Sequence, residues 1–173
     1  MIQAFRILTL CLLVTLLHAC GQSIDEASFS SKLTHNQFLL ERIGADIWSS
    51  SEAALIDIRD LHGKEPALDG LVTIPPSLKN KLNHSEWHQL KRANIAYITA
   101  DKDLGGVLFV LSTTGIAISG TATGYLLVFE TVPKEYQVRS INPAIEAKLR
   151  AGQNKFRLVK PLDSKWAIFY DRY

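Results

Sequence analysis

The sequence predicts an α+β domain: N-terminal helices packed on a mainly antiparallel sheet of about six strands, arranged as a meander plus a C-terminal hairpin. Three observations lead to this prediction. Apolar residues recur at helical spacing in the first half of the chain and in strand-like runs after residue 95. The strand-like runs are joined by short links rich in glycine and threonine, which favour antiparallel neighbours. The chain then closes with two further strand-like runs.

The first helix is expected over residues 28–48, where five apolar side chains fall close to one helical face. Ser49 and Glu52 form a capping-box pattern, which predicts a second helix carrying Leu55 inward and ending at Gly63. The inward residues of the first helix are Phe29, Leu33, Leu40, Ile43 and Ile47.

Two more helices are expected before the sheet. A short extended segment at 71–74 leads to Pro75-Pro76, a pair that suits the first turn of a third helix. Ser85 is the expected N-cap of a fourth helix, which would turn Trp87 and Leu90 toward the core.

The meander is expected to contain four strands. The second is continuously apolar, as for a strand buried on both faces. The links at 113–115 and 120–124 contain glycine and threonine and are expected to be turns. The four predicted strands cover residues 95–99, 107–111, 116–119 and 125–129.

A short helix and a hairpin complete the domain. Asn142 is the expected N-cap of the helix and Pro143 its first residue, with Leu149 facing inward. The hairpin pairs residues 156–159 with residues 166–170.

The N-terminus has the form of a signal peptide. Residues 7–17 are apolar except for two threonines, a length typical of the signal core and too short for a comfortable bilayer-spanning helix. The run ends in Leu17-His18-Ala19-Cys20, which resembles the lipobox of bacterial lipoproteins. His18 is less usual than a small residue at its position.

The resemblance implies cleavage before Cys20 and acylation of its thiol, which would tether the protein to a membrane. Two or more acyl chains give stable anchoring, whereas one chain anchors only marginally. The absence of aspartate after the cysteine favours the periplasmic face of the outer membrane. We therefore expect a signal peptide at 1–19, a lipidated tether at 20–27 and one domain at 28–173. An ordinary secretory signal cleaved after Ala19 and an uncleaved short anchor are the alternatives.

Composition excludes several kinds of chemistry. Cys11 lies within the signal and Cys20 is the lipidation site, so the mature chain would have no thiol for a disulfide, a nucleophile or a thiolate zinc site. The formal net charge of +2 gives no electrostatic case for binding nucleic acid. No cofactor-binding loop was identified, because the glycine-rich segment 113–124 lies between strands.

We assign no catalytic residue and no metal site. His84 and His88 are four residues apart, but no third ligand completes a set at suitable spacing. No nucleophile-elbow pattern surrounds a serine. Carboxylates near predicted strand ends leave a glycosidase open, although exposed turn carboxylates are far commoner. They are Asp101, Asp103, Glu130 and Glu135.

The aromatic C-terminus supports two interpretations. Trp166 and Tyr170 share one face of the last predicted strand, and Tyr173 follows them. Core packing is the favoured interpretation, and a patch for a partner protein is the alternative. The leading functional hypothesis is a non-enzymatic envelope lipoprotein that binds an envelope protein or component. An envelope or cell-wall hydrolase and a carrier of lipid or another small molecule are the alternatives.

Overall fold

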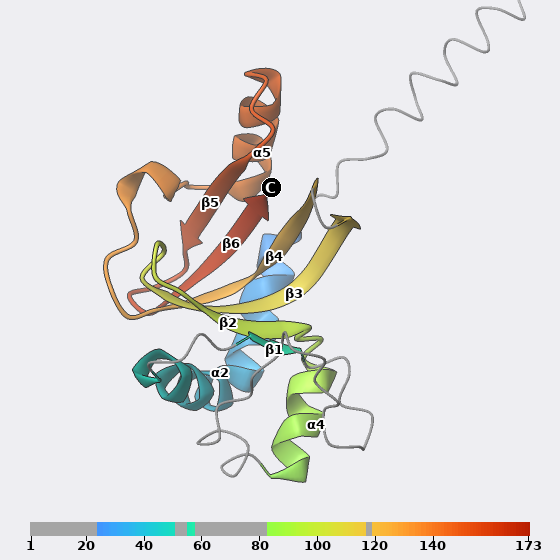
Figure 1. Cartoon of the computed structure of the whole chain (residues 1–173), viewed down its shortest axis with the longest axis vertical. Helices are drawn as coiled ribbons and strands as arrows, with labels where there is room; N and C mark the ends of the chain where they lie inside the picture. The colour runs from blue at the N-terminus through green and yellow to red at the C-terminus, as the bar shows by residue number, and fades with distance from the viewer. Residues whose placement is uncertain (1–23, 51–54, 58–82, 117–118) are drawn as a thin grey trace, which may run out of the picture.

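The computed structural model describes residues 24–50, 55–57, 83–116 and 119–173, and it confirms the predicted α+β architecture (Figure 1). Its strands form one sheet in the order β1-β2-β3-β4-β6-β5, and every neighbouring pair is antiparallel. The strands are β1 (Leu55–Asp57), β2 (Tyr97–Asp101), β3 (Gly106–Ile116), β4 (Ser119–Val128), β5 (Phe156–Pro161) and β6 (Trp166–Arg172). The helices are α2 (Glu26–Ser49), α4 (His84–Arg92), α5 (Ile141–Arg150) and the 3-10 turn η1 (Lys134–Tyr136).

Helix α2 packs on one face of the sheet, as predicted for the first helix. Asp25 is its N-cap and accepts a hydrogen bond from the Ser28 backbone N–H. Gly44 allows the helix to approach closely, because a Cβ there would lie 2.5 Å from Cδ2 of Leu127. Four of the predicted inward residues are buried and Phe29 is partly buried; the four are Leu33, Leu40, Ile43 and Ile47.

The centre of the sheet has fewer and longer strands than predicted. Residues 113–115 and 120–124 were expected to be turns, but they continue β3 and β4 as one long hairpin. The four-stranded meander is therefore wrong, and β2, β3 and β4 form a meander of three. Gly124 belongs within β4 because a Cβ there would lie 2.0 Å from the Phe109 carbonyl oxygen of β3. This glycine serves a close approach of two strands instead of a turn.

The second predicted helix is contradicted where the structure describes it. Leu55 lies in β1, which pairs with β2, and Ser49 ends α2 instead of capping another helix. Pairing with β1 covers backbone groups that would otherwise form an open edge of β2, and this outweighs local helical preference. The extended segment predicted at 71–74 and the helix expected to begin at Pro75-Pro76 lie outside the described residues.

Two predicted helix caps are displaced. Asn83 caps α4 and forms a capping box with Glu86, so the predicted cap at Ser85 is wrong. Ser140 occupies the N-cap position of α5, and Asn142 lies inside the first turn. Asn142 has an alternative partner, described below, which explains why its side chain does not cap the helix.

The sheet curls until its distant corners meet. Three strands separate β2 from β5 in the sheet order, yet Arg157 of β5 forms an ion pair of 2.6 Å with Asp101 of β2. Leu104, in the link between β2 and β3, is fully buried in the same cluster as Val159 of β5. Helix α2 thus covers one face, and the curl covers much of the other. Among the described residues, no helix combines the length and apolar character needed to cross a bilayer.

Candidate functional site

The predicted lipidation site, Cys20, lies outside the described residues. Ile24, the first of the described residues, is only 8% exposed, and α2 starts two residues later. The tether predicted at 20–27 is therefore too long, because its last four residues already belong to the domain. Their polar side chains suggested a linker, but those same groups cap α2 and bind α5.

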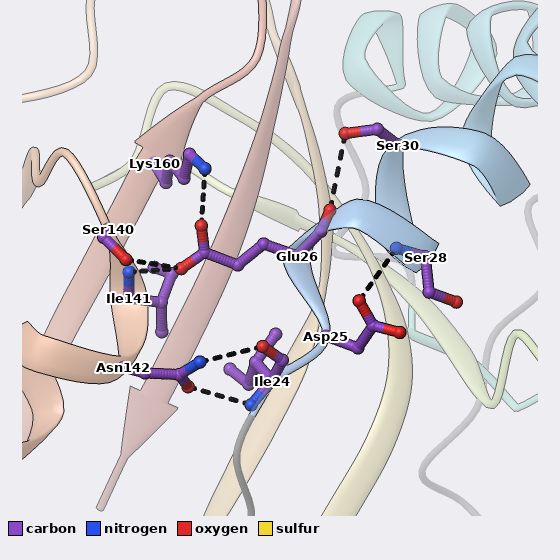
Figure 2. A network of polar contacts seen from close by, with 9 residues as sticks. All are labelled: Ile24, Asp25, Glu26, Ser28, Ser30, Ser140, Ile141, Asn142 and Lys160. Carbon is purple, nitrogen blue, oxygen red and sulfur yellow. Dashed lines mark hydrogen bonds and ion pairs between the residues drawn. The ribbon is translucent and has the colours of Figure 1, made fainter.

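A polar network fixes the point where the chain enters the domain (Figure 2). The Asn142 side chain accepts a hydrogen bond of 2.8 Å from the Ile24 backbone N–H and donates one of 2.9 Å to the Ile24 carbonyl oxygen. One amide side chain thereby satisfies both backbone groups of a residue 118 positions away in the sequence. Asn142 therefore holds the entering chain to the first turn of α5.

Glu26 makes the second half of this network. Its Oε1 accepts hydrogen bonds from Ser140 Oγ at 3.0 Å and from the Ile141 backbone N–H at 2.7 Å, while Oε2 pairs with Lys160 Nζ (Figure 2). Burial alone would raise the pKa of Glu26, but the hydrogen bonds to Lys160, Ile141 and Ser140 outweigh it and lower the pKa. We call these contacts the entry network: Ile24, Glu26, Ser140, Ile141, Asn142 and Lys160.

The predicted aromatic residues do not share one surface. Trp166 is fully buried against α2, and Tyr170 is 6% exposed and stacks on Phe156 with ring centroids 5.8 Å apart. These positions match core packing, the favoured interpretation. Tyr173, at 45% exposed, is the only member of the proposed patch on the surface.

Trp166 is also fixed through its indole nitrogen. Its Nε1–H donates a hydrogen bond of 3.2 Å to Glu41 of α2, and Gln37 donates another to the same carboxylate. The hydrogen bond from Gln37, the one from Trp166 and the positive charge of Lys165 all lower the pKa of Glu41. The tryptophan therefore joins α2 to the start of β6.

A groove of about 390 Å³ opens beside Trp166, between the segment after β4 and the turn from β5 to β6. The charged side chains that line it are those of Glu130 and Asp163, both carboxylates. One oxygen of Asp163 accepts backbone hydrogen bonds from Lys165 and Trp166, so this residue also shapes the turn. The lining residues are Val128, Phe129, Glu130, Thr131, Val132, Gln137, Pro161, Asp163, Ser164, Trp166 and Ala167.

Phe129 is the exposed aromatic residue of this groove, with 39% of its surface accessible. Its ring stacks on Trp48 of α2 at 5.3 Å with an angle of 4° between planes. Lys102 Nζ lies 3.4 Å from the centroid of the same Trp48 ring, a cation–π contact. The stack holds Phe129 in position while leaving it partly open to solvent. We call these features the aromatic groove.

The other candidate residues, Asp101, His84 and His88, do not line the aromatic groove. Asp101 is bound to Arg157, which also binds Asp171 through two hydrogen bonds of 3.1 and 2.9 Å. Burial raises the pKa of Asp171. Burial alone would lower the pKa of Arg157, but its hydrogen bonds to Asp171 and Asp101 outweigh burial and raise that pKa. His88 lies within α4 and is exposed. His84 is the first residue of α4.

Within the described ranges, no group of three or more His, Cys, Asp or Glu side chains is arranged to hold a metal ion. Comparison of the chain with protein-family models, curated proteins and solved structures found no match. The aromatic groove escaped sequence reasoning because Trp48, Lys102 and Phe129 lie in separate parts of the chain. Glu130, already considered as a carboxylate near a strand end, was the one signal of its position.

Proposed function

We propose that this protein is a lipid-anchored, non-enzymatic binding module of the bacterial cell envelope, held by acyl chains on Cys20 at the periplasmic face of the outer membrane. The signal-like N-terminus and the lipobox resemblance support the anchor. The early start of the domain is consistent with it, because only three residues separate Cys20 from the packed residue Ile24.

The aromatic groove is the proposed binding site, and the exposed Phe129 on its Trp48 support is the observation that carries the proposal. Aromatic side chains held rigid but exposed are common anchors in protein interfaces. Glu130 and Asp163 give the groove a negative lining. The occupant with complementary chemistry is an extended segment of an envelope protein that presents a cationic side chain beside an apolar one.

The two alternative functions receive less support. For a hydrolase, Asp101 was a candidate carboxylate, but its ion pair with Arg157 holds the corner of the sheet. For a carrier, an enclosed apolar cavity would be needed, whereas the aromatic groove is open and has carboxylates in its lining. Binding of a protein segment requires only exposed aromatic and charged side chains, and the groove provides both in Phe129 and Glu130.

The test is photo-crosslinking in cells with a photoreactive amino acid replacing Thr131 of the full-length protein. Thr131 lines the groove and is exposed; Ser31, exposed on α2, is the matched control. We expect a discrete adduct from position 131, absent from position 31 and weakened by Phe129→Ala or Glu130→Lys. A Cys20→Ala version should also weaken it, because the protein would lose its place on the membrane. Equal adducts from both positions, or none from either, would contradict a binding site at the groove.

A further inference from the structure

A group of basic side chains lies at the end of the sheet opposite the aromatic groove. The groove end is lined by Glu130 and Asp163. At the other end, the last turn of α5 contains Lys148 and Arg150, and Lys155 follows in the link to β5. Glu146, on the same helix, pairs with Arg150 at 3.4 Å.

An exposed leucine lies among these basic residues. Leu149 was predicted to face the core, but it is 40% exposed between Lys148 and Arg150. Gly152 ends the helix at a φ of +73°, and a Cβ built there would meet nothing within 4 Å. The end of α5 therefore projects into open space, and Figure 1 shows it reaching past the sheet. We call Lys148, Leu149, Arg150 and Lys155 the α5 tip.

The α5 tip stands about one helix length from the entry point of the chain. Ile141, the first residue of α5, and Phe156, the first residue of β5, belong to the same buried cluster as Ile24. The ten residues of α5 span about 15 Å at 1.5 Å per residue. Tyr173, another exposed apolar side chain, lies at this end, since its neighbour Arg172 pairs with Phe156.

The spacing of the anchor limits how far this end can stand from a bilayer. The four residue steps from Cys20 to Ile24 reach at most about 14 Å when fully extended. The entry network then ties Ile24 to α5 through Asn142, so the domain cannot swing on a longer linker. The fully extended tether from Cys20 to Ile24, about 14 Å, is therefore similar in length to α5, about 15 Å.

We propose that the α5 tip docks on the surface of a bilayer containing anionic phospholipid, with its basic side chains at the headgroups and Leu149 in the interface. Each Lys or Arg near such a surface is attracted to it, and an exposed apolar residue adds a shallow contact. This inference rests on the proposed lipid anchor at Cys20. It turns the aromatic groove, at the far end of β6, away from the membrane and toward a partner.

The test uses the full-length protein processed by cells and reconstituted in vesicles that contain about 30 mol% phosphatidylglycerol in phosphatidylcholine. A fluorophore is placed on Ala151→Cys, beside the α5 tip, or on Ser164→Cys in the groove; both positions are exposed. Lipids with a nitroxide headgroup quench fluorophores near the surface. We expect quenching about threefold stronger at position 151 than at position 164. The quenching at position 151 should fall toward that at position 164 when Lys148→Glu and Arg150→Glu are combined, or when the vesicles are pure phosphatidylcholine.

Two failures are distinguishable in this experiment. If the protein floats with the vesicles but both positions are quenched equally, the docking of the α5 tip is wrong while the anchor stands. If the protein does not float and Cys20 reacts with maleimide in the version without an added cysteine, the anchor is absent and the docking inference falls with it.

Discussion

The entry network and the aromatic groove both lie along the β5–β6 hairpin but use their polar groups differently. At the entry network, the side-chain oxygens of Glu26 and Asn142 accept hydrogen bonds from other groups of the same molecule. At the groove, Phe129 and Glu130 remain exposed although a buried tryptophan lies beside them. Polar residues that hold each other stabilise a fold, whereas exposed aromatic and charged residues on a rigid support suit recognition. Mutations at the two sites should therefore separate stability from binding.

Trp166→Ala should have the largest effect, since this side chain is fully buried between α2 and the sheet. Loss of a buried tryptophan leaves a cavity, and we expect the free energy of unfolding to fall by about 3–5 kcal/mol. Urea denaturation followed by circular dichroism measures it, with Trp166→Phe as a milder control. A loss under about 1 kcal/mol would show that Trp166 behaves as a surface residue.

Glu26→Ala should rank second. It removes the carboxylate that accepts bonds from Ser140 and Ile141 and pairs with Lys160, whose ammonium is partly buried. We expect a loss of about 2 kcal/mol in unfolding free energy. Glu135→Ala, at an exposed position, is the matched control and should change little. Equal effects of the two substitutions would mean that the entry network does not hold the domain.

The pH dependence of Glu26→Gln sharpens the same point. The pKa of Glu26 is lowered below its ordinary 4.5, so its ionised form stabilises the folded state above that pH. The stability difference between wild type and Glu26→Gln should be full at neutral pH and shrink as pH falls through the lowered pKa.

Asp171 has the opposite sign, because its raised pKa gives stability below its ordinary 3.8 that is lost as pH rises. Chemical denaturation across this range, in both proteins, cancels the Asp171 contribution; a constant difference would contradict the assigned role of Glu26.

Phe129→Ala should have the smallest effect on stability. The ring is partly exposed and its stack on Trp48 contributes about 1 kcal/mol. The thermal midpoint should therefore move by a few degrees at most, while crosslinking from position 131 should fall sharply. Phe109→Ala, at a fully buried position, serves as the contrast and should lower the midpoint far more. A large loss of stability from Phe129→Ala would place this residue in the core instead of a binding site.

Local patterns predicted what depends on local physics. The helical spacing in residues 28–48 identified α2, and the C-terminal hairpin formed as expected at β5 and β6. The errors arose where distant contacts decide the structure. Gly124 resembles a turn residue until the carbonyl oxygen of Phe109 is placed against it, and Asn142 resembles a helix cap until Ile24 is placed beside it. The aromatic groove was missed for the same reason.

The most direct test of the account is the intact mass of the protein purified from membranes, followed by sequencing of its N-terminal peptide. We predict a chain that begins at Cys20 and carries two or three acyl chains, so that the packed domain starts four residues from the lipid. Cys20→Ala should yield no acylated form. A mature chain that begins elsewhere, or that begins at Cys20 without lipid, would contradict the membrane anchor and the orientation that depends on it.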